Sequence, residues 1–270
     1  MTLIAASLGV IVLVLLMIRF SIGSRYRRDL KRLQHLTATA PVATFRYELL
    51  EGLPLPVQRY FRYALPDGQP YIRTATVRHG GRFRQGLNSS WMRIRGETFF
   101  TTSKPGLLWK GQTAFFTAID SFLWGKGSLS VYLFGLFKIV SGKGYKYSQG
   151  ELQRWLAESV LFPTNLLPGP TLSWTAVSDD KARMTYTGRR LLLHFLVAFN
   201  EHDQITSIKT ERYMGNKELK PWTGTLSKYQ KINGVRVPTV MKASWRLGEK
   251  EFCYADFRIH SIRYDLPLNK

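Results

Sequence analysis

The sequence predicts an α+β protein, mainly β, with one large curved antiparallel sheet, half-barrel-like, inserted helices and an N-terminal transmembrane helix. Three observations predict it. The first 22 residues are almost wholly apolar. From about residue 71 onward, short segments alternate between apolar and polar side chains, as half-buried strands do. Turn pairs such as Gly80-Gly81 and Asn233-Gly234 separate these segments, which is typical of antiparallel hairpins.

The first element is a transmembrane anchor over residues 1–22. Residues 2–18, TLIAASLGVIVLVLLMI, carry no charge. If Arg19 reaches toward the headgroups, the apolar helix is about 30 Å long, which is enough to cross a bilayer. A cleaved signal peptide has a basic start and a small-residue cleavage site, and neither stands out here. We therefore expect an uncleaved, single-pass anchor.

A basic amphipathic juxtamembrane segment follows over residues 23–45. Arginines and lysines crowd between Arg19 and Arg32, with Asp29 as the single acid among them. Apolar side chains recur there at helical spacing, at Tyr26, Leu30, Leu33 and Leu36. By the positive-inside rule this charge places the large domain in the cytoplasm. A domain competent for export would instead lie on the periplasmic side.

Residues 46–270 form the sheet domain, and a short helix opens it. Pro56 suits a helix start, and Pro66-Asp67-Gly68 suits a helix stop. Between them one apolar stripe is predicted, formed by Val57, Tyr60, Phe61 and Ala64. We expect this helix to pack on the sheet that follows.

The strands of the sheet, about ten in number, come next. WMRIR places Arg93 and Arg95 on one face and Met92 and Ile94 on the other. LLLHFLVAF, residues 191–199, is apolar on both faces, which predicts a strand covered on both sides. Between the two halves of the sheet, a helical insertion over about residues 117–167, including LSVYLFGLFKIV, is expected to fill or close the concave face.

Four segments carry a resemblance to a known family: LPLPVQRYFRYALPDGQP, GELQRWLAESVLFPTNLLPG, KPWTGTLSKYQKINGVRVPT and RIHSIRYDL. Over about residues 50–265 the chain resembles an uncharacterised bacterial family, a domain of unknown function with an N-terminal anchor. Gly150–Glu158 and Pro221–Gly224 match its G-E-L-x-R-W/Y-L-A-E and P-W-x-G motifs. The resemblance implies a place in the bacterial inner membrane but carries no activity. In layout the domain is similar to lipoprotein-carrier folds that hold acyl chains.

Three positions allow more than one interpretation. Glu151, Arg154 and Glu158 fall on one stripe of a helix, either as an exposed ion-pair edge, the commoner arrangement, or as a polar cluster at a cavity mouth. Asp120 lies among apolar residues and suits a helix N-cap or a buried role. His194 interrupts an apolar strand, as a hydrogen-bonded core histidine or one that contacts a ligand.

Several function classes find no support in the sequence. The single cysteine, Cys253, cannot form an internal disulfide, and the five histidines lack metal-binding spacing, so no cofactor or metal is expected. The net charge is +21, but the basic residues are spread along the chain without a recognition helix. We therefore expect membrane lipids as partners and no specific nucleic acid.

The leading hypothesis is a membrane-anchored, non-enzymatic domain that binds an apolar or lipid-like ligand in a concave pocket. Arg93, Arg95 and Arg154 are expected to meet an anionic head group. The pocket and its rim are expected to include Trp109, Asp120, Phe122, Trp124, Trp155, Glu158 and His194. The alternative is an accessory or structural subunit of a larger membrane protein complex. A hydrolase that uses Asp120 or Glu158 is a third possibility, which Arg154 between the acids disfavours.

Overall fold

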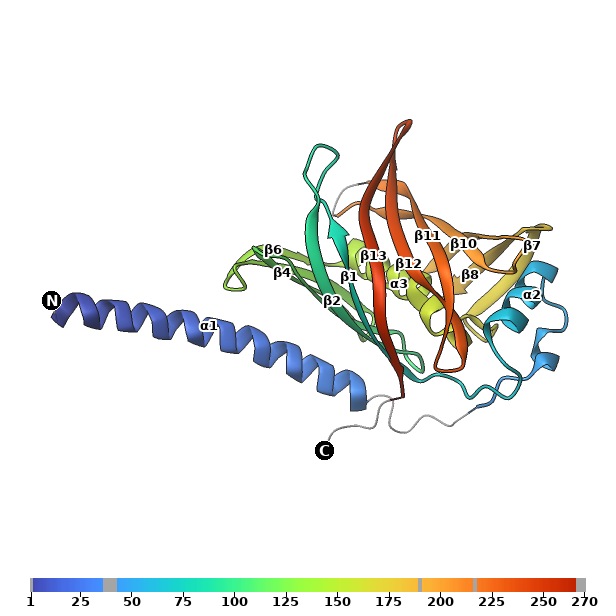
Figure 1. The fold of residues 1–270 in the computed structure, drawn as a ribbon, viewed down its shortest axis with the longest axis horizontal. Coiled ribbons are helices and arrows are strands. Elements are labelled where there is room, and N and C mark those ends of the chain that lie inside the picture. The colour runs from blue at the N-terminus through green and yellow to red at the C-terminus, as the bar shows by residue number, and fades with distance from the viewer. Residues whose placement is uncertain (1, 36–42, 189–190, 216–217, 266–270) are drawn as a thin grey trace.

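The computed structural model describes residues 2–35, 43–188, 191–215 and 218–265, with side chains for residue 13 and from residue 15 onward. Thirteen strands in these ranges form one antiparallel sheet, and Figure 1 shows that the sheet is strongly curved. The predicted class, mainly β with one large antiparallel sheet and few helices, is confirmed.

The helices and strands have the following bounds. The helices are α1 (Thr2–His35), α2 (Leu55–Ala64), α3 (Tyr145–Glu158) and the short 3-10 turns η1 (Tyr47–Leu50), η2 (Ser159–Leu161) and η3 (Pro163–Leu166). The strands are β1 (Thr74–Phe83), β2 (Met92–Thr101), β3 (Gly106–Gln112), β4 (Phe116–Leu123), β5 (Lys126–Leu133), β6 (Phe137–Lys143), β7 (Leu172–Ser178), β8 (Lys181–Thr187), β9 (Leu192–Phe199), β10 (Ile205–Tyr213), β11 (Leu219–Ile232), β12 (Val235–Leu247) and β13 (Lys250–Tyr264).

Two meanders joined at their inner strands make up the sheet. Strands β1 to β6 follow each other outward on one side, and β13 back to β7 follow each other outward on the other. β1 pairs with β13, as in Val77 with Ile262, and this pairing alone joins the two meanders among the described strands. The outer strands β6 and β7 are therefore the edges of the sheet.

Helix α3 connects the two edge strands by crossing the concave face (Figure 1). Trp155 fixes it there, because its indole N–H donates to the carbonyl oxygen of Thr101 on β2 at 2.8 Å. Beyond the helix, the ring of Phe162 lies 4.8 Å from that of Phe100, also on β2. A helical segment between the two halves of the sheet is thus present, but it covers residues 145–166 and not 117–167.

Residues 116–143 form three strands, β4, β5 and β6, so the helix predicted through LSVYLFGLFKIV is wrong. Both connecting turns have two residues with positive φ, Trp124-Gly125 (51° and 77°) and Phe134-Gly135 (52° and 69°). Such hairpin turns usually carry Asn-Gly or Asp-Gly. Because an aromatic residue occupies the first position in both, the apolar run reads as continuous.

Strand β9 is buried on one face only, which corrects the expectation of cover on both sides. Leu193, Phe195 and Val197 face the core, whereas Leu192 is 60% exposed. His194 is exposed on the same outer face, where Nδ1 lies 3.1 Å from the hydroxyl of Thr185. His194 is therefore not the core histidine that the sequence favours.

The C-terminal part of α1 packs on the convex face of the first meander, opposite α3. Leu33 contacts Phe99 of β2 and Leu108 of β3 in a small apolar cluster of its own. A helix is thus present as far as His35, as expected for this part of the segment 23–45, whose juxtamembrane position stays a prediction. Leu36 and the break expected after it lie outside the described residues. Helix α2 has the predicted buried stripe and packs near β8 and β12.

Among the described residues, no helix combines the length and the apolar character that crossing a membrane requires. The anchor predicted over residues 1–22 falls mostly outside the described side chains, because those of residues 1–12 and 14 are not described.

Gly80-Gly81 is not the turn that the sequence predicts, because both residues lie within β1 and pair with β13. Close packing of β1 against β13 predicts a strict requirement for glycine at position 81. Gly81 has a φ of +141°, and a Cβ there would lie 2.2 Å from the carbonyl oxygen of Asp256. We expect Gly81→Ala to lower the free energy of unfolding by roughly 3 kcal/mol or more. Urea unfolding followed by tryptophan fluorescence measures it.

Gly125→Ala is the matched control, because Gly125 also has a positive φ, +77°, but no atom lies within 4 Å of its would-be Cβ. Its cost is that of the backbone conformation alone, about 1 to 2 kcal/mol. Equal losses in the two variants would contradict the close contact at Gly81.

Candidate functional site

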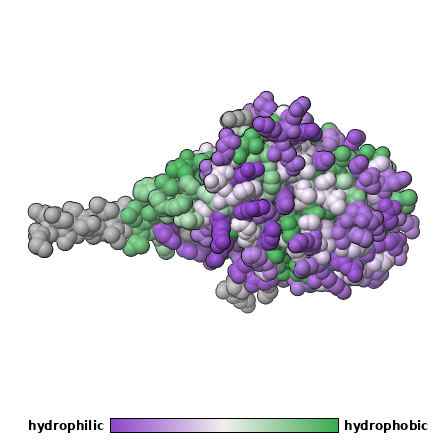
Figure 2. Space-filling view, turned by 45° about the horizontal axis from the view of Figure 1, so that its top comes forward, coloured by the Kyte–Doolittle hydropathy of each residue, from purple (hydrophilic) through white to green (hydrophobic). Residues whose placement is uncertain are grey.

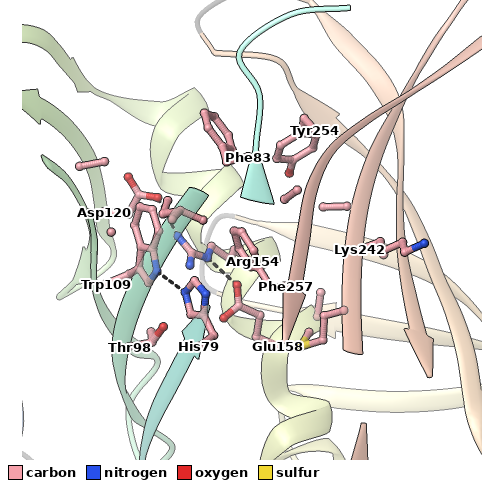
Figure 3. Close-up of a pocket in the computed structure, with 18 of the residues that line it drawn as sticks. His79, Phe83, Thr98, Trp109, Asp120, Arg154, Glu158, Lys242, Tyr254 and Phe257 are labelled. Atoms are coloured by element: carbon pink, nitrogen blue, oxygen red, sulfur yellow. Dashed lines mark hydrogen bonds and ion pairs between the residues drawn. The ribbon is translucent and has the colours of Figure 1, made fainter. Parts of the chain in front are cut away.

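A cavity of about 420 Å³ lies between the concave face of the sheet and α3 (Figure 3). We call it the concave cavity. Its walls are mostly apolar, because every second residue of the surrounding strands faces inward. The apolar walls include Val77, Ile94, Ala118, Ile208, Leu226, Ala243 and Phe257, from both meanders.

One polar cluster interrupts these walls, and Arg154 of α3 is its centre. The guanidinium donates to Glu158, one helical turn further on, at 2.6 Å, and to Asp120 of β4 at 2.7 Å. All three side chains are at most 22% exposed. The two ion pairs join the helix to the sheet, and we call the cluster and its neighbours below the Arg154 cluster.

Glu151 lies one turn before Arg154 and is 8% exposed. Burial, and secondly the negative charge of Asp120, raise the pKa of its carboxyl to about 8. Burial also raises the pKa of Asp120, although Arg154 opposes this. Glu151 is therefore mostly protonated at neutral pH, because burial disfavours its charged form more strongly than Arg154 and Arg212 favour it.

A second arginine, Arg212 of β10, reaches the same cavity. Its guanidinium donates to the carbonyl oxygen of Gly150 at 2.8 Å and lies 4.9 Å from the ring centre of Trp222. Arg154 has a similar aromatic neighbour, because its guanidinium lies 4.7 Å from the ring centre of Trp109. Both cations are thus held by aromatic faces as well as by hydrogen bonds.

His79 of β1 completes the cluster, 5% exposed. The indole N–H of Trp109 donates to its Nε2 at 2.9 Å, so the proton of the neutral ring is on Nδ1. Burial and the charge of Arg154 lower the pKa of His79 to about 3, so the ring is neutral. Gly96 makes room for this pair, because a Cβ there would lie 2.2 Å from His79 Nε2.

Four buried polar atoms of the Arg154 cluster have no hydrogen-bond partner among the described residues. They are Asp120 Oδ1, Glu151 Oε2, His79 Nδ1 and Arg212 Nε. The histidine and arginine nitrogens are donors, whereas the Asp120 oxygen is an acceptor. An unsatisfied buried polar group costs about 1 to 3 kcal/mol, so the cluster favours a bound group that carries both donors and acceptors. The described residues contain no set of His, Cys, Asp or Glu side chains that suits a metal ion.

Four of the residues expected at the pocket line the concave cavity: Trp109, Asp120, Arg154 and Glu158. Of the two interpretations of the Glu151, Arg154 and Glu158 stripe, the polar cluster at a cavity is the one that the structure shows. Asp120 does not cap a helix, because it lies within β4 and pairs with Arg154.

The other expected residues do not line the cavity. Arg93 and Arg95 are exposed, because Met92 and Ile94 take the inward positions of β2. Phe122 and Trp155 are buried in the core. Trp124 is 54% exposed at the turn between β4 and β5, near Arg32 of α1, and His194 is on the outer face of β9.

Two residues of the cluster, His79 and Arg212, escape the sequence prediction. Both carry a signal in the strand alternation, since His79 shares the inward face of β1 with Val77, and Arg212 that of β10 with Ile208. Neither is close in sequence to Arg154. The alternation therefore predicts that their side chains face inward, but it does not predict that they lie near Arg154.

Comparisons with known proteins give the following matches. Residues 43–257 match the model of a family of unknown function, DUF6544. A comparison with curated protein sequences finds no match. The structure is similar to a LolA superfamily protein from Nitrosomonas europaea, with 11% identity, a TM-score of 0.43, and coverage of 83% of this chain and 96% of that one. It is also similar to a domain assigned as an outer membrane lipoprotein-sorting protein, from Vibrio parahaemolyticus, with 11% identity, a TM-score of 0.43, and coverage of 82% and 95%.

The raised pKa of Glu151 predicts how stability depends on pH. Between pH 6.5 and about 8 the native carboxyl retains its proton, whereas in the unfolded chain it ionises near 4.5. The native state then binds more protons than the unfolded state, so the free energy of unfolding falls as the pH rises. We expect a fall of about 1 kcal/mol per pH unit, measured by urea unfolding, that Glu151→Gln removes.

His79 opposes this fall only at the lower end of the window. Its pKa of about 3 leaves the native ring neutral, whereas the unfolded ring, with its ordinary value of 6.5, is half protonated at pH 6.5 and largely neutral above about pH 7.5. Glu211→Gln, at an exposed carboxylate of β10, is the control and should leave the slope unchanged. The same slope in Glu151→Gln and the unaltered protein would contradict the assignment.

Proposed function

We propose that this domain, which belongs to the DUF6544 family, binds an amphiphile in its concave cavity. The apolar chain of the ligand lies in the concave cavity, and its neutral, hydrogen-bonding head group meets the Arg154 cluster. The observation that carries this proposal is the composition of the cavity wall, which is mostly apolar and contains one cluster of buried, charged side chains, the Arg154 cluster.

The size and walls of the cavity suit an alkyl chain. Its volume of about 420 Å³ falls within the range of small-molecule sites, roughly 300 to 1,000 Å³. Each methylene group that leaves water for such walls contributes about 0.8 kcal/mol of binding free energy. Aliphatic residues such as Ile94 and Leu226, from opposite meanders, offer this surface on two sides.

The charge balance of the cluster favours a neutral head group. Arg154 and Arg212 carry two positive charges, Asp120 and Glu158 carry two negative charges, and Glu151 is mostly protonated at neutral pH. An added carboxylate would be buried beside two cations whose charges are already balanced, which is costly. The other cation that lines the cavity, Lys242, is exposed and lies apart from the cluster in Figure 3. A hydroxyl or amide group can instead satisfy the unpartnered donors and acceptors without bringing a charge.

Binding fits the arrangement better than hydrolysis. A glycosidase needs one carboxyl group as acid and a second as base or nucleophile. Here both Asp120 and Glu158 accept hydrogen bonds from, and form ion pairs with, the same guanidinium, that of Arg154. The ion pairs hold these carboxylates against the arginine, in a structural role.

The proposal includes a single-pass anchor over residues 1–22 in a bacterial inner membrane. The apolar residues 2–18 support it, as do the exposed side chains of Leu16 and Phe20 on α1. The basic residues from Arg25 to Arg32 favour the cytoplasmic side for the large domain. A tethered domain of this kind lies next to a constant supply of amphiphiles.

Filling the cavity is expected to remove the ligand. Ala118 of β4 lines the concave cavity, so Ala118→Phe places a ring in the space of the alkyl chain. Native mass spectrometry and lipid extraction of the full chain, purified in mild detergent, should find an amphiphile that the variant retains about tenfold less, equivalent to about 1.4 kcal/mol.

Ala176→Phe is the control, because Ala176 is an exposed strand residue of β7 outside the cavity. Circular dichroism confirms that each variant is folded, and Ala243→Leu, on the opposite wall, replaces Ala118→Phe if that variant unfolds. The proposal is refuted if the wild-type protein carries no amphiphile, or if all variants retain the amphiphile equally.

The head group itself is tested with two ligands that share one acyl chain, monoolein and oleate. At neutral pH we expect monoolein to displace a fluorescent monoacylglycerol analogue from the full chain, and oleate to bind about tenfold more weakly. Glu158→Gln removes one negative charge beside Arg154, so it should narrow this difference. Glu97→Gln, which removes an exposed carboxylate paired with Arg78, should leave it unchanged. Tighter binding of oleate to the wild type would refute the neutral head group.

A further inference from the structure

Apolar side chains are exposed together at one end of the first meander. Phe115, Phe134, Phe137 and Ile139 are each more than half exposed, between 52% and 56%. They lie in the β3–β4 connection, the β5–β6 turn and the edge strand β6. The backbone N–H of Phe134 donates to the carbonyl oxygen of Phe115 at 2.6 Å, and their rings are 6.2 Å apart. We call these four residues the hairpin end.

The hairpin end adjoins the part of α1 that leaves the sheet. Met17, Ile18 and Ile22 of α1 share a groove with Tyr132 and Leu136, and Leu136 lies in the turn between Phe134 and Phe137. On α1, Leu16, Met17 and Phe20 are themselves exposed. Figure 2 shows hydrophobic side chains gathered at this end of the molecule, between the body and the protruding helix. The exposed apolar surface is therefore continuous from the helix to the sheet.

Basic side chains accompany this apolar surface. Arg25 of α1 and Lys138 of β6 line the same groove, and the Lys138 ammonium lies 5.5 Å from the ring centre of Tyr132. Asp29 is the one acid in the neighbouring groove, which Lys126, Lys138 and Lys143 also line. Near an anionic bilayer each such cation contributes about 1 kcal/mol of attraction.

We infer that the hairpin end enters the interface of an anionic lipid bilayer beside α1. Monomeric soluble proteins seldom expose contiguous apolar patches of this kind, and aromatic residues are enriched at the membrane interface. Continuity with the apolar residues 2–18 and the cations beside the patch favour a lipid surface over a second copy of the chain, whose own cations would repel it. Phe115, Phe134 and Phe137 would lie among the acyl chains near the headgroups, with Lys138 and Arg25 at the phosphates.

The hairpin end also connects to the concave cavity along one face of the sheet. Val131 of β5 lines the cavity and pairs with Val140 of β6, while Leu133 pairs with Phe137. Paired residues of neighbouring strands share a face, so Phe137 and Val140 extend the apolar wall to the edge of the sheet. If the proposed function holds, an alkyl chain reaches the cavity along this wall without crossing water; the membrane contact itself does not rest on that function.

The test places a polarity-sensitive probe at the hairpin end. Cys253→Ser removes the one native cysteine, and Phe137→Cys then carries an NBD label. The full chain is reconstituted in vesicles of phosphatidylcholine and phosphatidylglycerol in equal parts, and flotation shows that it is bound. Val177→Cys is the matched control, because Val177 is an exposed apolar residue of the opposite edge strand, β7.

We expect the emission of the label at position 137 to shift to shorter wavelength and to be quenched by doxyl-labelled lipids, and the label at position 177 to do neither. Matching spectra at the two positions overturn the inference, as does a protein that does not float with the vesicles. A blue shift at position 137 without quenching by doxyl lipids indicates contact with a second copy of the chain, and that outcome overturns the inference too.

Discussion

The buried charge of Arg154 is the constraint on which the cavity depends. A guanidinium with 14% exposure needs partners, because removing one partner of a buried ion pair costs about 3 to 5 kcal/mol. Those partners are Asp120 on the sheet and Glu158 on α3 itself. The length of the Arg154 side chain thus sets the separation between α3 and β4. The apolar side of the helix packs on the core through Leu152 and Trp155, while its polar side lines the cavity through Arg154 and Glu158.

Strand periodicity made most of the sheet predictable from the sequence. β2 shows this well, because Met92 and Ile94 alternate with Arg93 and Arg95 as expected. The prediction fails where turns lack their usual residues, at Trp124-Gly125 and Phe134-Gly135, because without a turn signal the strands β4, β5 and β6 resemble helices in the sequence. It fails again at β9, where exposed leucines on the outer face imitate a strand buried on both sides. In each case a local pattern was ambiguous, and only the three-dimensional neighbours decide it.

The site was predictable only in part, for a related reason. The helical spacing of Glu151, Arg154 and Glu158 identifies a polar stripe, but the same stripe occurs on many solvent-exposed helices. The stripe becomes a site because Asp120 of β4, His79 of the first meander and Arg212 of the second meander lie around the same cavity as Arg154. Those encounters depend on the register of strands far apart in the chain, about which the sequence pattern carries no information. Of the three arginines expected to bind a head group, Arg154 reaches the cavity, whereas Arg93 and Arg95 share the outward face of β2, because alternation defines a face but not which face is covered.

The pairing of β1 with β13 has a consequence for how the chain acquires its shape during synthesis. Ala75 pairs with Tyr264, so the inner edge of the first meander stays open until nearly the whole described chain has left the ribosome. Contacts between residues so distant in sequence form slowly, since a long loop must close first. Until then β1 and the unfinished second meander each expose an unsatisfied row of backbone groups, the kind of edge at which nascent chains associate wrongly. Among the described strands, the one translated last, β13, is the one that joins the two meanders.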